Sequence, residues 1–558
     1  MDRGRGARAR LAVFLCDCGD EIASVVDLPR VAKELEALDE TLVVLRAPYW
    51  CSRAGRRLLE ETIAEHRLDA VVVAGCSSRT HGDLIGRVAE RAGLNRHRAL
   101  LVNLREHCAR VHTGRPSRAT AKALRLIRMG MEKAARARPL EPITAEVERS
   151  AVVIGGGVAG MTAARALAKR AVPVALIERE RELGGVLRSV NRLYPTYCDA
   201  SEYVGELSNE LLSDPNVEIM KETTVTGVSG HVGAYRLAVE TPDGAREVPA
   251  GCVVLATGAD VLRPDGLFGY GENPKVVTQI EFEDVLRSGL ADVKRIVMIQ
   301  CAGSRNADRP YCSRVCCTAA VKNTITVIES VPDATVTVLT RGFAQYVGDL
   351  DRAREAGVAF LRYDPERPPV VGPDAVRVFD VISSEEVSIP YDLVVLATPL
   401  VGRKETAELA KLFNLPVDDF CFVAEPHTKL RPGAFAPCGV FVAGSAHWPA
   451  TVTECLSQAH AAAGRAASLI ECGSIERLPL VARVDELACR GCERCVEACA
   501  HRAPALRDGE DGFRTSEIDE IRCVGCGVCV NVCPSGAITL SHLTQEQLLS
   551  MVGAAVAS

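Results

Sequence analysis

The sequence predicts an α/β protein of several domains that ends in a smaller, cysteine-rich α+β module. Three observations support this fold class. Short apolar runs alternate with helical stretches through most of the 558 residues. A G-x-G-x-x-G sequence at 155–160 joins one apolar run to an alanine-rich helical stretch. Two cysteine runs of the same spacing follow near the C-terminal end, and the length leaves room for about three or four domains.

The stretch 151–178 has the pattern of a strand, a glycine turn, a helix and a second strand that ends at Glu178. The turn contains Gly155, Gly156, Gly157 and Gly160. Glycines at this spacing permit a tight turn and a close approach of the backbone to a pyrophosphate. The helix N-terminus then faces the phosphates, and the acid can bind a ribose hydroxyl. The stretch therefore predicts a Rossmann-like dinucleotide-binding unit.

Later segments favour FAD over NAD as the ligand of this unit. The Gly-Gly pair that follows Leu183, and the sequence VVLATG at 253–258, are similar to motifs of flavoproteins with two dinucleotide-binding domains. The sequence GVFVAGSA at 439–446 leads into a helix whose N-terminus would face the flavin. We expect FAD to contact Gly184, Gly185, Gly258 and Gly444 in addition to the first glycine turn.

The composition is that of an ordinary globular protein. Hydrophobic residues make up 47% and charged residues 25% of the chain, and the net charge of −6 gives no reason to expect nucleic acid as a partner. The apolar run at 11–15 is too short for a secretory signal. Because no apolar run approaches the ~20 residues needed to span a bilayer, we expect a cytoplasmic protein without a membrane span.

The C-terminal cysteines have the spacing of a bacterial ferredoxin with two 4Fe–4S clusters. The first run is Cys489, Cys492, Cys495 and Cys499. The second run is Cys523, Cys526, Cys529 and Cys533, followed by a proline. In this spacing the fourth cysteine of each run ligates the other cluster. We therefore expect Cys533 to join the first three cysteines of the first run, and Cys499 to join those of the second.

A second group of thiols stands where a nicotinamide-binding glycine loop would be expected. The strand expected at 292–299 would lead into another G-x-G-x-x-G sequence in a pyridine-nucleotide-dependent flavoprotein. Here it leads instead into four cysteines, Cys301, Cys312, Cys316 and Cys317. We infer an iron–sulfur cluster at this strand end. A redox-active disulfide among these thiols is the alternative.

The N-terminal region alternates apolar runs at 11–16, 41–45, 70–74 and 99–103 with helical stretches. Five cysteines follow or end these runs: Cys16, Cys18, Cys51, Cys76 and Cys108. In a parallel sheet the strand ends share one edge, where such folds bind ligands. The five thiols could thus supply four ligands to one further cluster, whereas scattered reduced cysteines are the alternative.

These motifs divide the chain into five parts. The basic stretch after the N-terminal domain is expected to form a solvated linker helix. The flavoprotein core, which is similar to thioredoxin reductase, then contains two Rossmann-like lobes. The expected boundaries are 1–116 for the N-terminal α/β domain, 117–149 for the linker, 150–475 for the core with its second lobe at about 263–390, 476–545 for the ferredoxin module and 546–558 for a tail.

The motifs and their order resemble the flavin-carrying A subunit of heterodisulfide reductase over nearly the whole chain. The matching segments are LCDCGDEI, VAGCSSRTH, NLREHCARVHT, VIGGGVAGMTAA, ELGG, the QCAGSR…YCSRVCC…K run, VFVAGSA and the ferredoxin module. The resemblance implies one FAD and four 4Fe–4S clusters. It also implies that the cysteines at 301–317 ligate a cluster near the flavin, that the N-terminal cysteines hold another, and that Lys322 lies beside the isoalloxazine ring.

The resemblance further implies an oxidoreductase that branches electrons from its flavin between iron–sulfur chains. Its expected partners are other subunits of a heterodisulfide-reductase-like complex, ferredoxin, and a hydrogenase or formate dehydrogenase that supplies electrons, with the chain forming a homodimer within the larger complex. Larger family members carry an additional two-cluster ferredoxin inserted in the flavin domain. Between Gly185 and Gly258 this chain has only Cys198 and Cys252. A non-branching relay to a quinone-linked or thiol-metabolising partner, and an assembly module that docks other subunits, are therefore the alternatives.

Overall fold

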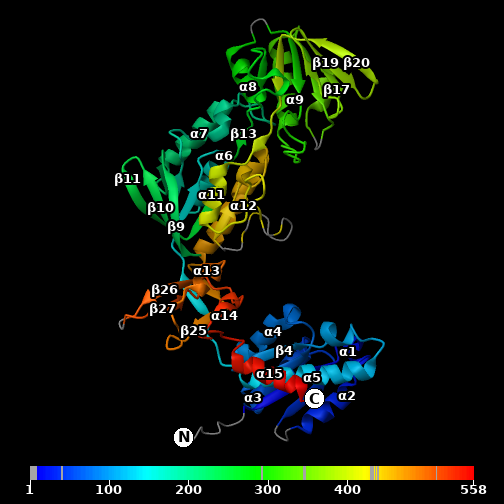
Figure 1. Ribbon diagram of the computed structural model, residues 1–558, viewed down its shortest axis with the longest axis vertical. Coiled ribbons are helices and arrows are strands. Elements are labelled where there is room, and N and C mark those ends of the chain that lie inside the picture. The colour runs from blue at the N-terminus through cyan, green and yellow to red at the C-terminus, as the bar shows by residue number, and fades with distance from the viewer. Residues whose placement is uncertain are drawn as a thin grey trace. The chain divides into compact units, whose positions relative to one another are not determined.

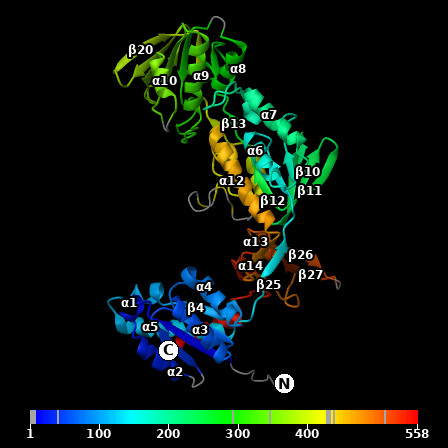
Figure 2. The same cartoon turned by 180° about the vertical axis from the view of Figure 1, so that it is seen from behind.

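The computed structural model of the chain describes residues 9–38, 42–290, 293–343, 347–425, 427, 433, 435, 439–509 and 512–557. The chain folds into two compact units, which Figures 1 and 2 show from opposite sides. The first unit combines Met1–Ile143 with Glu476–Ser558, and the second is Thr144–Ile475. The second unit is thus inserted in sequence between the two parts of the first. Among the described residues no helix is both long enough and apolar enough to cross a membrane.

The N-terminal part of the first unit is a parallel sheet with strand order β2-β1-β3-β4. The strands are β1 (Leu11–Cys16), β2 (Val43–Ala47), β3 (Ala70–Gly75) and β4 (Ala99–Asn103). The helices that connect them are α1 (Asp20–Ala23), α2 (Leu28–Glu36), α3 (Arg53–Glu65) and α4 (Ser78–Arg91). Every residue of β1 and β3 is buried because helices cover both faces of the sheet. Residue 41, where the predicted second strand begins, lies outside the described residues.

Helix α5 (Pro116–Ala135) is a part of this N-terminal core, although its basic composition predicts a solvated linker. Its buried face consists largely of small residues such as Ala119 and Ala123, which pack against the sheet together with Ile127. The helix lies so close to β4 that a Cβ added to Gly130 would come within 2.4 Å of a methyl group of Val102. The N-terminal domain therefore extends through α5.

The ferredoxin module contains two short antiparallel strand pairs and two short helices. Its elements are β25 (Ala482–Val484), α13 (Arg494–Ala498), β26 (Pro504–Asp508), β27 (Arg514–Ile518), α14 (Val528–Val532) and β28 (Ile538–Leu540). Strand β25 pairs with β28, and β26 pairs with β27. The chain then ends in helix α15 (Gln545–Val556), which packs on α5 of the N-terminal domain. The segment expected to be a tail is thus an ordered helix that joins the two parts of this unit.

The first lobe of the second unit is a three-layer structure. Its parallel sheet has the strand order β23-β12-β6-β7-β8, and an antiparallel sheet has the order β11-β10-β9. The strands are β6 (Ala151–Ile154), β7 (Val174–Ile177), β8 (Val217–Met220), β9 (Thr224–His231), β10 (Ala234–Thr241), β11 (Gly244–Ala250), β12 (Cys252–Leu255) and β23 (Val440–Val442). Helices α6 (Val158–Ala168), α7 (Ala200–Ser213) and α12 (Val452–Glu471) pack on one face of the parallel sheet, and the antiparallel sheet covers the other.

The second lobe repeats this plan. A parallel sheet of order β14-β21-β15-β16-β17 is accompanied by an antiparallel sheet of order β18-β19-β20. The strands are β14 (Val276–Thr278), β15 (Arg295–Ile299), β16 (Thr335–Thr340), β17 (Ala359–Arg362), β18 (Val370–Val371), β19 (Ala375–Asp380), β20 (Glu385–Pro390) and β21 (Leu393–Leu396). The helices are α8 (Gln279–Ser288), α9 (Cys316–Ser330) and α10 (Leu350–Glu355). Strand β21 belongs to this sheet, so the second lobe extends beyond its expected end at about residue 390. Residue 292, where the strand predicted at 292–299 begins, lies outside the described residues.

A few short elements complete the chain. Strands β13 (Asp260–Val261) and β22 (Leu400–Val401) pair antiparallel where the chain passes between the two lobes, and helix α11 (Lys404–Leu412) follows. Strands β5 (Ile143–Glu146) and β24 (Ser474–Arg477) lie at the points in sequence where the chain enters and leaves the second unit.

Candidate functional site

The glycine turn between β6 and α6 has the backbone geometry expected of a dinucleotide cradle. Gly155 has a φ of +112°, and a Cβ at this position would lie 2.3 Å from the carbonyl oxygen of Ala256. A Cβ at Gly160 would lie only 1.8 Å from the carbonyl oxygen of Gly155, so the helix and the turn are in direct backbone contact. A Cβ at Gly157 would meet no atom within 4 Å. The N-terminus of α6 therefore opens on free space in which a pyrophosphate can approach the backbone.

Glu178 is held against this turn at the end of β7. The side chain is buried, and its carboxylate accepts hydrogen bonds from the backbone N–H groups of Gly156 (2.6 Å) and Glu180 (2.9 Å). A Cβ at Gly156 would come within 2.5 Å of a methyl group of Leu183 and within 2.9 Å of this carboxylate, so a larger residue here would displace both side chains. The position matches that of the acid that binds a ribose hydroxyl in Rossmann-like units.

The other predicted flavin glycines surround the same helix end. Gly184 forms a β-bridge with Gly157, and a Cβ at Gly185 would lie 3.3 Å from the Cα of Gly157. Gly444 packs against the first turn of α6, since a Cβ added to Gly444 would lie 2.8 Å from the Cβ of Ala159. Gly258, at the end of the VVLATG sequence, has a φ of +72° and open space around it. The residues present therefore fit FAD, and the structure brings all of the predicted glycines to one place.

The loop between β15 and α9 gathers the four thiols of the second lobe. Cys301 lies two residues after the end of β15, and Cys316 and Cys317 begin α9. Burial, with a smaller contribution from the charges of Cys301 and Cys312, raises the pKa of Cys316 to about 12. Burial also raises the pKa values of Cys301 and Cys317, and Cys312 lies within electrostatic reach of both. Thiols that are largely buried and within electrostatic reach of one another suit a metal cluster, because the positive charge of its metal ions stabilises thiolates that burial otherwise disfavours.

An ion pair connects this thiol loop to the flavin lobe. The backbone N–H of Arg314 donates to the sulfur of Cys312 at 3.3 Å, and the Arg314 guanidinium pairs with the carboxylate of Glu454. Glu454 lies in the first turn of α12, where it also forms a capping box with Thr451. The loop that carries Cys312 is therefore tied to the helix whose N-terminus is expected to face the flavin.

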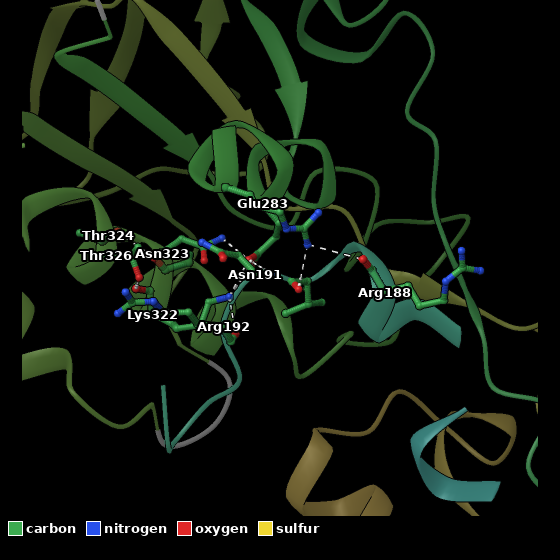
Figure 3. A network of polar contacts seen from close by, with 11 residues as sticks. Arg188, Asn191, Arg192, Glu283, Lys322, Asn323, Thr324 and Thr326 are labelled. Carbon is green, nitrogen blue, oxygen red and sulfur yellow. Dashed lines mark hydrogen bonds and ion pairs between the residues drawn. The ribbon is translucent and has the colours of Figure 1, made fainter. Parts of the chain in front are cut away.

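Lys322 forms a buried ion pair that the sequence alone does not reveal (Figure 3). Its ammonium donates to both carboxylate oxygens of Glu283, at 2.7 and 2.8 Å, and to the backbone oxygen of Arg192 at 2.9 Å. The two charged side chains are each 3% exposed. Burial lowers the pKa of Lys322, and the charge of Glu283 opposes this shift. All three ammonium N–H groups thus have acceptors, while a position beside the isoalloxazine ring remains a prediction.

The Lys322–Glu283 pair also connects the two lobes. The carboxylate of Glu283 accepts hydrogen bonds from the Asn323 side chain (2.8 Å) and from the backbone N–H of Asn191 (3.0 Å). Asn191 belongs to the first lobe, whereas Glu283 and Lys322 come from α8 and α9 of the second (Figure 3). An acid on an amphipathic helix carries no sequence signal of such a role, which is why Glu283 could not be singled out in advance.

A cavity of about 440 Å³ at the edge of the N-terminal sheet is lined by four of the five predicted thiols, Cys16, Cys18, Cys51 and Cys76. His81 also lines it, with its Nδ1 3.0 Å from the sulfur of Cys76, and so does Arg105, whose Nη1 lies 3.7 Å from the sulfur of Cys18. Burial raises the pKa of Cys76 to about 11. The cavity is of a kind that a polynuclear cluster with cysteine ligands can occupy.

Cys108 does not belong to this group of thiols. It lies in the turn that follows β4, is fully buried, and donates from its sulfur to the backbone oxygen of Ala119 in α5 at 3.0 Å. It therefore packs in the hydrophobic layer beneath α5, away from the cavity. Of the five candidate ligands, the structure brings together four.

The ferredoxin module combines thiols of the two runs as the spacing predicts. Cys499 of the first run lines a small cavity together with three thiols of the second run, Cys523, Cys526 and Cys529. Burial raises the pKa of Cys529 to about 11, and the charges of these neighbours contribute. In the other group, the sulfurs of Cys489 and Cys495 both contact Ser516, and Cys492 is exposed. Cys533 directly follows α14, and its sulfur lies 3.6 Å from the Ser535 hydroxyl.

Comparison with known families agrees with this division of the chain. Residues 149–463 match the family described as pyridine nucleotide-disulphide oxidoreductase, which covers both lobes of the second unit. Residues 488–537 match the 4Fe-4S dicluster domain family. The flavin oxidoreductase fold and the ferredoxin module are thereby confirmed.

Several curated proteins are similar over most of the chain. The iron-sulfur A 2 subunit of CoB–CoM heterodisulfide reductase from Methanopyrus kandleri is 30% identical over 610 residues, with 90% of this chain and 92% of the relative aligned. The A subunit of the ferredoxin/F(420)H(2)-dependent CoB-CoM heterodisulfide reductase of Methanosarcina acetivorans is 30% identical, with 88% and 74% aligned. The A subunit of the H(2):CoB-CoM heterodisulfide,ferredoxin reductase of Methanothermobacter marburgensis is 29% identical, with 90% and 91% aligned.

Proposed function

Because the chain belongs to the A-subunit family of heterodisulfide reductases, we propose that this oxidoreductase is the electron-branching component of a heterodisulfide-reductase-like complex. FAD would bind at the N-terminus of α6, and 4Fe–4S clusters would be held by the ferredoxin thiols, by the four thiols at 301–317 and by the four thiols of the N-terminal cavity. When bound, FAD can exchange electrons both in pairs and singly, which lets a protein of this kind link two-electron donors to iron–sulfur chains.

The observation that carries this proposal is the replacement of a glycine loop by thiols in the second lobe. Gln300 and Cys301 follow strand β15, and the four thiols, which lie within electrostatic reach of one another, belong to the loop and helix start at the strand end where a nicotinamide nucleotide would otherwise bind. The Arg314–Glu454 ion pair ties this loop to the flavin lobe. This arrangement supports electron exchange between a flavin and a cluster, rather than hydride transfer from NAD(P)H.

The segment between Gly185 and Gly258 is where larger family members carry an additional ferredoxin, which would provide a second path for electrons. The alignment with the Methanopyrus relative is 610 positions long, longer than this whole chain of 558 residues, so the relative contains segments that this chain lacks. Here residues 186–257 form α7 and β8–β12, with Cys198 exposed and Cys252 buried in β12. We propose that partner subunits supply the missing branch, with a hydrogenase or formate dehydrogenase as the donor, and with ferredoxin and a thiol or disulfide acceptor receiving the branched electrons.

A non-branching relay is the second candidate, and the shorter flavin domain favours it. In a relay the chain would pass electrons between one donor and one partner complex, and no second exit would be needed. The two candidates differ in one requirement. A branching protein turns over only when both acceptors are present, whereas a relay turns over with its single acceptor and does not need the second.

Anaerobic stopped-flow absorbance of the purified, FAD-loaded chain tests the proposed function. We expect reduced ferredoxin to bleach the flavin absorbance on the time scale of the stopped-flow experiment. NADH should reduce the bound flavin no faster than it reduces free FAD, because the second lobe lacks the glycine loop that would bind the nucleotide phosphates. Rapid reduction by NADH would contradict the proposal. Steady-state turnover of the assembled complex with and without a low-potential ferredoxin then separates branching from relay.

A further inference from the structure

We propose that Arg305, assisted by Arg341, raises the reduction potential of the iron–sulfur cluster at Cys301, Cys312, Cys316 and Cys317. The inference rests on the proposed function, because it requires a cluster at these thiols. It assigns a role to two arginines that neither the cysteine spacing nor the family comparison singles out.

Arg305 lies in the same loop as Cys301 and is fixed against its sulfur. One guanidinium nitrogen, Nη1, lies 3.8 Å from the sulfur of Cys301 and also donates to the backbone oxygen of Gly342 at 3.0 Å. The carbonyl anchors the guanidinium, so its position does not depend on the thiol alone. The backbone of Arg305 has a φ of +55°, and its N–H donates to the backbone oxygen of Tyr311 at 3.3 Å, which fixes the residue within the loop. The side chain is half-buried, which limits the screening of its charge by water.

Arg341 adds a second positive charge from a different loop. It directly follows β16, and its Nη1 donates to the backbone oxygen of Ser304 at 3.2 Å, which ties it to the loop that carries Cys301. Its Nε is buried and has no hydrogen-bond partner among the described residues. Although burial raises the pKa of Cys301, the charges of Arg305 and Arg341 both act in the opposite direction, which shows that both guanidiniums lie within electrostatic reach of this sulfur.

Gln300 contributes a third feature. Its side chain is 1% exposed, and both its amide nitrogen and its amide oxygen lack partners among the described residues. Because side chains alternate along an extended strand, Gln300 faces the same side of the sheet as Met298, which packs in the core with α9. A buried amide with unused N–H groups is thus placed on the side of the sheet where Cys316 and Cys317 begin α9.

These features favour the reduced cluster. A cluster with four thiolate ligands becomes more negative when it accepts an electron, so a nearby positive charge or an N–H group directed at a sulfur stabilises the reduced form more than the oxidised form. In the ferredoxin module, by contrast, the sulfurs of Cys489 and Cys523 accept hydrogen bonds from the backbone N–H groups of Ser516 and Ala482. The charged guanidinium contact distinguishes the second-lobe site from the two clusters of the ferredoxin module, and it suits a cluster that accepts electrons from the flavin.

The test is an anaerobic redox titration, followed by EPR, of the full chain with its flavin and clusters. The signal of the second-lobe cluster is identified as the one absent from Cys316→Ser. We expect Arg305→Gln to lower the ratio of reduced to oxidised cluster about tenfold at a fixed potential, a shift of about 59 mV for a one-electron couple. The signals of the ferredoxin clusters should not move. Arg305→Lys keeps the positive charge but cannot contact both the Cys301 sulfur and the backbone oxygen of Gly342, so it should shift the reduction potential less than Arg305→Gln does.

Arg309→Gln is the matched control, because Arg309 lies in the same loop and its described hydrogen bonds, both with Asn306, are made by its backbone N–H and its backbone oxygen. An unchanged potential in Arg305→Gln with full iron content would overturn the inference. If Arg305→Gln loses four irons, its potential cannot be measured, and Arg341→Gln is used instead. We expect a lower reduction potential in Arg341→Gln as well, and an unchanged potential in that variant would overturn the inference. A wild-type protein without iron at this site would instead contradict the proposed function itself.

Discussion

Gly160→Ala is expected to yield a chain that does not bind FAD and that is destabilised by about 3 kcal/mol or more. The added Cβ would lie 1.8 Å from the carbonyl oxygen of Gly155, and a backbone atom in a buried turn cannot move aside as a flexible side chain can. The helix would have to shift away from the turn, which would remove the cradle for the pyrophosphate. Flavin absorbance per chain after purification measures the first effect, and hydrogen exchange of the backbone amides of α6 in the flavin-free protein measures the second.

Gly157→Ala is the matched control three residues away. Its φ of −74° and ψ of 179° suit any residue, and the added Cβ would meet no protein atom within 4 Å. The flavin-free variant should therefore unfold like the wild type, while its affinity for FAD falls because the methyl group occupies the space in which the pyrophosphate approaches the backbone. Wild-type affinity for FAD in Gly157→Ala would show that the phosphates bind elsewhere.

Lys322→Ala is expected to cost about 3–5 kcal/mol, because it leaves the carboxylate of Glu283 buried without its counter-ion. Both side chains are 3% exposed, so water cannot replace the ammonium. Since a chain with several domains does not unfold in a single step, hydrogen exchange of the backbone amides in α8 and α9 is the suitable measurement. Exchange there should become faster, while exchange in the N-terminal sheet should not change.

The double variant Lys322→Met with Glu283→Met separates a structural role of Lys322 from a role at the flavin. Replacing a buried ion pair with apolar residues of similar size is often nearly neutral for stability. The double variant should therefore recover much of the protection that the single variant loses. If its flavin is still reduced and reoxidised at wild-type rates, the prediction that Lys322 acts on the isoalloxazine ring is wrong, and the ion pair serves to hold the lobes together.

The sequence predicts the elements of this fold best where burial leaves a continuous apolar run. The runs at 11–16 and 99–103 coincide with β1 and β4, because strands of a parallel sheet covered by helices are apolar throughout. The basic helix α5 is harder to place, since it buries mainly small residues such as Ala119 and Gly130 while its arginines and lysines suggest a solvated surface. Contact through small residues leaves a weak hydrophobic pattern.

The candidate sites likewise include residues that the sequence predicts and residues that only the structure reveals. Local spacing is sufficient to predict the ferredoxin cysteines and the flavin glycines, because each motif encodes its geometry within a few residues. Contacts between distant segments are not encoded in this manner. The exclusion of Cys108 depends on how the turn after β4 packs beneath α5, the role of Glu283 depends on the distance between α8 and α9, and the approach of Arg305 to Cys301 depends on the loop conformation.

Iron and flavin content of the anaerobically purified chain tests the central claim most directly. We predict one FAD and about sixteen irons per wild-type chain, from four 4Fe–4S clusters. Cys316→Ser should lose about four irons, whereas Cys108→Ser should lose none, because that thiol packs in the core beneath α5. About eight irons in both the wild type and Cys316→Ser would contradict the account, since only the ferredoxin module would then hold clusters and the thiols of the second lobe would have another purpose.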